Sequence, residues 1–95
     1  MASLYYVENA GCDDSTCGLV EIPDEHFPAF KTFIENLNKN STYGCMPTIS
    51  VYKIDRSNIR PYDEETDSKS EWLYFEGGIY TLTNYRMCTP MELVI

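Results

Sequence analysis

The sequence predicts a single small α+β domain in which one helix packs on an antiparallel β-sheet, with the elements in the order ββαβββ. Three observations lead to this fold class. The 95 residues are enough for one hydrophobic core but not for two. Several short runs rich in β-branched and aromatic residues are bounded by turn residues, which is typical of strands. One segment places its apolar residues at helical spacing. Because no repeat and no internal boundary is visible, we expect residues 1–95 to form one domain.

Two strands are expected before the helix. Residues 4–8, LYYVE, are rich in strand formers, and residues 18–22 form a second short run of this type. If these strands pair antiparallel, the segment 11–17, GCDDSTC, is the loop that joins them. In such a loop Asp and Ser side chains accept hydrogen bonds from nearby backbone amides, so the simplest interpretation of this segment is a braced turn.

A helix is expected to follow the second strand. Asp24 and Glu25 place carboxylates at the positive end of a helix dipole. Pro28 lacks an amide hydrogen and fits only in the first turn, so the helix should begin close to Glu25 and end between Asn38 and Asn40. Apolar side chains then recur at helical spacing and are expected to face the sheet: Phe27, Phe30, Phe33, Ile34 and Leu37.

A third strand is expected over residues 47–54. Its side chains should alternate between two faces, with Ile49 and Val51 on one face and Tyr52 and Ile54 on the other. Residues 55–70 are polar and acidic and show no periodicity, which predicts a long exposed loop.

A β-hairpin is expected over residues 71–83, because Gly77 and Gly78 supply the positive φ angles of a two-residue turn. Counting outward from these glycines pairs Phe75 with Tyr80 and Leu73 with Leu82. These four side chains would share the core face under the helix, and Trp72 and Tyr74 would share the other face. Residues 91–95 are apolar and are expected to pack back on the sheet.

The charge balance restricts the classes of partner. With 15 acidic and 7 basic residues, the formal net charge is −8. A chain of this charge repels phosphate backbones, so we expect no direct nucleic-acid binding, whereas a basic protein surface would attract it. No run of about 18 apolar residues is present to span a membrane. The first residues lack the features of a secretion signal, so we expect a cytoplasmic protein.

The four cysteines do not form a strong metal-binding pattern. Only Cys12 and Cys17 are close in sequence, whereas Cys45 and Cys88 are isolated. We expect buried free thiols, with a zinc site or a disulfide (Cys12 with Cys45 or with Cys17) as alternatives. The single histidine, His26, lies at the helix start, and nothing in the sequence places it beside a nucleophile. We therefore expect a non-enzymatic protein with no metal site and no cofactor.

Two groups of residues are candidates for binding. The first combines aromatic anchors with neighbouring carboxylates, a composition typical of protein interfaces. It comprises Asp63, Glu64, Glu65, Asp67, Trp72 and Tyr74. The second would hold a small ligand such as a nucleotide signal between two loops, across the interface of a homo-oligomer. It comprises Asp13, Asp14, Ser15, Thr16 and Tyr43.

Two segments of the first half, GCDDST and NSTYGCMPTISV, resemble small proteins of unassigned activity encoded by bacteriophages and prophages. The residues that carry this resemblance are Gly11, Cys12, Asp13, Asp14, Ser15, Thr16, Ser41, Tyr43, Gly44, Cys45, Pro47 and Thr48. The resemblance implies a phage setting and no particular mechanism. With the size and charge, it predicts an accessory protein that inhibits a host protein in the host cytoplasm, first of all a nucleic-acid-directed defence complex, as anti-CRISPR proteins do. The alternatives are a nucleotide-sequestering protein and a virion structural or assembly protein.

Overall fold

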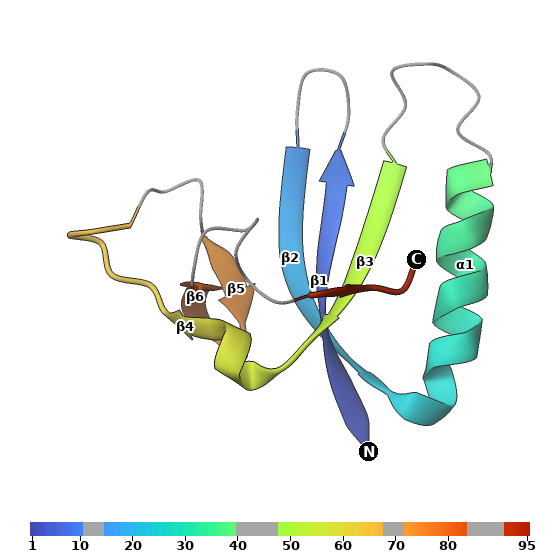
Figure 1. Ribbon diagram of the computed structural model, residues 1–95, viewed down its shortest axis with the longest axis horizontal. Coiled ribbons are helices and arrows are strands. Elements are labelled where there is room, and N and C mark those ends of the chain that lie inside the picture. The colour runs from blue at the N-terminus through green and yellow to red at the C-terminus, as the bar shows by residue number, and fades with distance from the viewer. Residues whose placement is uncertain (11–14, 40–47, 68–71, 84–90) are drawn as a thin grey trace.

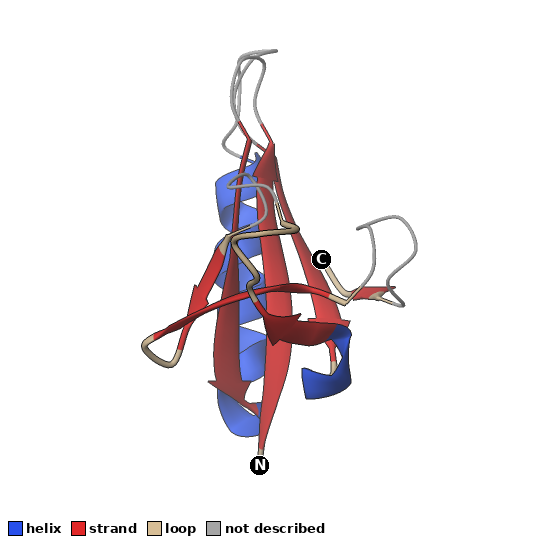
Figure 2. Cartoon of the chain, turned by 90° about the vertical axis from the view of Figure 1, so that its left-hand side faces the viewer, coloured by secondary structure: helices blue, strands red, loops and turns tan. Residues whose placement is uncertain are grey.

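The computed structural model describes residues 1–10, 15–39, 48–67, 72–83 and 91–95. This part of the chain forms three layers (Figure 1 and Figure 2): one helix, a four-stranded antiparallel sheet and a small three-stranded antiparallel sheet. The predicted α+β class, with one helix packed on antiparallel strands, is confirmed.

The main sheet has the strand order β2-β1-β3-β7. Its strands are β1 (Ala2–Ala10), β2 (Ser15–Pro23), β3 (Thr48–Ile54) and β7 (Glu92–Leu93). The β1–β2 ladder runs from the pair Ala2 and Pro23 to the pair Ala10 and Ser15. Residues 15–17 therefore lie in β2, and their prediction as part of a loop was wrong, since the antiparallel ladder continues through them.

The helix begins and ends where the sequence predicts. A short 3-10 turn, η1 (Asp24–His26), leads into α1 (Phe27–Lys39), and Pro28 lies in its first turn. Ile34 is buried and the ring of Phe27 stacks on Tyr5 with centroids 5.0 Å apart. Phe33 and Leu37, expected to face the sheet, are 60% and 40% exposed. A helix buries only one arc of its surface, and Phe33 is turned about 100° from Ile34.

The main sheet carries a core on each face. Towards α1 lie Tyr5 and Val51, and Val51 is 0% exposed. On the other face, Tyr6 and Ile54 pack with Leu73 of the small sheet. The predicted division of the third strand, with Ile49 and Val51 on one face and Tyr52 and Ile54 on the other, is confirmed.

The small sheet has the strand order β4-β6-β5. Its strands are β4 (Ile59–Pro61), β6 (Gly78–Leu82) and β5 (Leu73–Phe75), and a 3-10 turn, η2 (Arg56–Asn58), precedes β4. The predicted loop over residues 55–70 was therefore wrong for residues 56–61. Three residues are too few for a strand to show an alternating pattern, so β4 is recognised only by its pairing with β6.

The predicted hairpin exists, but its turn lies one residue earlier than expected. Glu76 and Gly77 have φ angles of 50° and 77°, and Leu73 pairs with Tyr80 instead of Leu82. Since the partner shifts by two residues, the side chains keep the faces that the sequence predicts. Their core face packs on the side of the main sheet opposite α1, not under the helix.

The β3 edge of the main sheet is closed by distant parts of the chain. β7 pairs with the end of β3, and the Val94 amide donates to the Val51 carbonyl oxygen at 2.8 Å. The side-chain nitrogen Nδ2 of Asn38 donates to the Ile49 carbonyl oxygen at 2.9 Å, and the Ile49 backbone amide donates to the side-chain oxygen of Asn38 at 2.8 Å. Within the described residues, β2 forms the opposite edge: β1 is the only strand hydrogen-bonded to it, and β5 packs against its face.

Candidate protein-binding surface

The acidic turn, defined as residues 63–67, follows directly on the small sheet. The Tyr62 amide donates to the Ile79 carbonyl oxygen at 3.0 Å, which fixes the start of the turn to β6. The Thr66 and Asp67 amides donate to the Asp63 carbonyl oxygen at 3.2 and 2.8 Å. The segment expected to be an irregular loop is thus a hydrogen-bonded turn at this point.

Asp67 holds the acidic turn together from inside. Its carboxylate accepts two hydrogen bonds from the Arg60 guanidinium, at 2.6 and 2.8 Å, and one from the Asp63 amide at 2.8 Å. The side chain is only 6% exposed. The Arg60 hydrogen bonds, followed by the Asp63 amide, lower the pKa of Asp67 from 3.8 to about 2. Asp67 was predicted as a partner contact, but its charge is already engaged by Arg60.

The outward carboxylates of the turn belong to Glu64 and Glu65. Both residues are exposed. The Glu65 amide donates to the Asp63 side-chain oxygen at 2.9 Å, so Asp63 braces the backbone that carries these two side chains. The structure therefore divides the predicted acidic residues into two that brace the turn, Asp63 and Asp67, and two that present charge to solvent.

An aromatic row, defined as Tyr62, Trp72 and Tyr74, adjoins the acidic turn. The Trp72 ring contacts Tyr62 and Tyr74 edge-on, with centroids 5.6 and 5.9 Å apart. Tyr74 is 63% exposed, while its neighbour Leu73 is buried against the main sheet. Tyr62, which sequence reasoning missed, joins the predicted aromatic residues to the predicted carboxylates. In the sequence, only its position directly before the acidic residues indicated that Tyr62 could belong to the binding surface.

Arg56 fixes the hairpin that carries the row. Its guanidinium contacts the carboxylates of Glu76 at 2.6 Å and Glu21 at 3.1 Å, and lies 5.2 Å from the centroid of the Phe75 ring. The hydrogen bond between Arg56 and Glu76 raises the pKa of Arg56 and lowers that of Glu76. These contacts tie β2 and η2 to β5, the strand on which Tyr74 lies.

The second predicted group cannot be assembled from the described residues. Asp13, Asp14 and Tyr43 lie outside them, as do Cys12, Cys45 and Cys88, while Ser15 and Thr16 are part of β2. Cys17 is a free thiol on β2, and it is exposed, in contrast to the predicted buried thiol. Its position on an edge strand explains the exposure.

Comparison with known proteins does not assign the surface to a family. No protein-family model, curated protein or solved structure matches the chain. Among the described residues, no three His, Cys, Asp or Glu side chains gather where they would bind a metal ion. The helices of the described chain are also too short or too polar to cross a bilayer. What the structure does offer is a surface of exposed carboxylates beside aromatic rings.

Proposed function

We propose that the protein is a non-enzymatic inhibitor that binds a basic surface of a host protein through the acidic turn and the aromatic row. One observation carries the proposal. The contacts of Trp72 with Tyr62 and Tyr74 link the exposed Tyr74 ring to the turn that carries the exposed Glu64 and Glu65 side chains. The nucleic-acid groove of a defence complex is the first candidate target, in the phage setting that the sequence resemblance implies.

The two parts of this surface have different energetic roles. Aromatic rings bury a large area with few rotatable bonds and are frequent anchors of protein interfaces. The carboxylates next to these rings would bind lysine and arginine side chains of the target protein that otherwise bind phosphates of a nucleic acid. The net charge of −8 adds long-range attraction to a basic target, and this attraction is weakened by salt. We therefore expect a fast, salt-sensitive association that competes with nucleic acid.

Contacts within the chain brace the acidic turn. A bidentate ion pair between Arg60 and Asp67 closes the turn, and the Tyr62 hydroxyl donates to the Asp67 carbonyl oxygen at 2.9 Å. A turn that is already ordered loses little conformational entropy when a partner binds, so more of the contact energy contributes to affinity.

The test uses the full chain, immobilised and exposed to a bacterial lysate. Captured proteins should be nucleic-acid-binding proteins, and a DNA duplex in the wash should release them. With a captured protein purified, the double variant Glu64→Lys/Glu65→Lys should weaken binding at least about tenfold, because each reversal places like charges across the interface. Tyr74→Ala should weaken it by removing an anchor.

The matched control is Glu25→Lys/Glu35→Lys, which makes the same change in net charge at exposed positions of η1 and α1. It should leave binding nearly unchanged. Equal losses in both double variants would show that only net charge matters and would refute the assigned surface. Captured proteins that DNA fails to displace would refute the assigned target. Thermal melting should show that every variant is folded at the temperature of the binding assay.

A further inference from the structure

The β2 edge of the main sheet differs from the β3 edge. Asn38, β7 and Val94 complete the hydrogen bonds of β3, whereas β2 is nine residues long and pairs, within the described chain, with β1 alone. Natural proteins protect such edges with short strands, bulges, proline or charged side chains. In β2 the only charged residue is Glu21, and the only proline is its last residue. Within the described residues, β5 packs against one face of β2 and Arg56 binds Glu21, but no strand pairs with the outer edge of β2.

We propose that β2 pairs antiparallel with β2 of a second copy of this chain, joining two main sheets across a two-fold axis at Leu19. Residues that face each other in an antiparallel pair lie on the same side of the sheet, so a two-fold axis perpendicular to the sheet must pass between equivalent residues. The axis at Leu19, the middle residue of Ser15–Pro23, is the one that pairs all nine positions.

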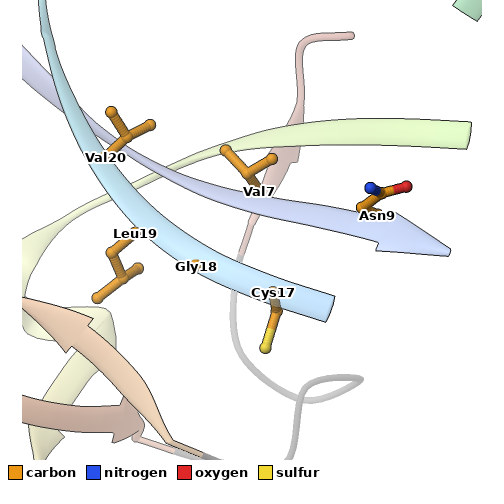
Figure 3. A pocket seen from close by; sticks show the side chains of 6 residues that line it. All are labelled: Val7, Asn9, Cys17, Gly18, Leu19 and Val20. Atoms are coloured by element: carbon orange, nitrogen blue, oxygen red, sulfur yellow. The ribbon is translucent and has the colours of Figure 1, made fainter. Parts of the chain in front are cut away.

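The side chains are self-complementary in this register. Gly18 of one copy lies opposite Val20 of the other. A Cβ atom placed on Gly18 would meet nothing within 4 Å, and a hollow of about 190 Å³ lies there, lined in part by Val7 and Leu19. Figure 3 shows Val7 and Val20 projecting on one side of the sheet and Leu19 on the other. Val20 of each copy would fill the space that Gly18 of the other copy leaves open.

The charges of the strand are also compatible with this register. Glu21 of one copy lies opposite Cys17 of the other, so the two Glu21 carboxylates do not face each other. α1 packs closest to β3, at the far side of the sheet from β2, although Val20 and Ile22 of β2 belong to the same core as Ile34 of α1. Each copy carries a net charge of −8, so the dimer should tighten as salt is added.

The test is sedimentation velocity of the full chain in reducing buffer, from about 1 to about 100 μM. The mass should rise from 11.0 kDa towards twice that value. Cys17→Glu faces Glu21 of the other copy at two places per dimer and should raise the dissociation constant about tenfold. Cys17→Lys, at the same exposed position, should lower it, and Cys17→Ser should leave it unchanged. Gly18→Val fills the hollow and should raise it.

Two outcomes would overturn the inference. The first is a mass of one chain at every concentration, whether the edge then stays open or takes an extended segment of another protein. The second is a dimer in which Cys17→Glu and Cys17→Lys change the dissociation constant in the same direction. Thermal melting of each variant checks that the monomer itself is folded. The salt dependence separates this contact from host-protein binding, which salt should weaken.

Discussion

Asn38 offers a sharp test of how the helix is joined to the main sheet. Its side-chain amide occupies the place of a neighbouring strand, donating to the Ile49 carbonyl oxygen and accepting from the Ile49 amide. Each such hydrogen bond contributes about 0.5 to 1.5 kcal/mol net, so Asn38→Ala should destabilise the protein by about 2 kcal/mol. For a domain of this size, that corresponds to a fall of about 8 to 16 °C in melting temperature.

The matched control is Asn36→Ala, at an exposed position of the same helix. Alanine has the higher helix propensity, so each substitution gains a few tenths of a kcal/mol from this source, and the difference between them isolates the contacts with Ile49. Urea unfolding should be followed by far-UV circular dichroism and by fluorescence of the single tryptophan, Trp72. A difference of less than about 0.5 kcal/mol between the two variants would refute the assigned role of Asn38.

Two further predictions concern the acidic turn and the hairpin. The pKa of Asp67 is lowered from 3.8 to about 2 in the folded chain, so the stability from its ion pair should be complete above about pH 4 and lost as pH falls towards 2. Asp67→Asn should remove this part of the pH dependence of the urea midpoint. Glu76 has a φ of 50°, and Asn adopts this left-handed conformation more readily than Glu. In an Arg56→Ala background, where the ion pair with Glu76 is absent, Glu76→Asn should therefore raise the urea midpoint. A lower midpoint would contradict the assigned turn.

The elements that the sequence predicts well are those specified by neighbouring residues. For α1, Pro28 and the apolar spacing lie within the helix itself, and the carboxylates of Asp24 and Glu25 lie in η1 directly before it. In β3 the alternation of side chains was enough to separate the two faces, because one strand with a core on each side must place successive residues in different cores. Patterns of this kind, in which neighbouring residues specify the same element, can be recognised without knowledge of the fold.

The errors occur where distant residues decide the local conformation. Gly77-Gly78 is the favoured turn dipeptide, yet the turn uses Glu76, which adopts a left-handed conformation while its carboxylate is held by Arg56 from η2. The acidic turn shows the same limit. In the sequence, the four acidic residues of this turn look alike within a polar segment. Only the pairing of β4 with β6 shows that Arg60 lies where it can bind Asp67.

The path of the chain between the two sheets has a consequence for the order of folding. The chain leaves the main sheet after β3, forms the small sheet, and returns as β7 to pair with Tyr52 and Lys53. The small sheet thus lies inside the loop that β7 closes. Closing a long loop costs chain entropy that the two residue pairs of β7 offset poorly unless the small sheet has already docked. We therefore infer that β7 is the last strand to join, and that amide exchange at Val94 reports when the three layers have assembled.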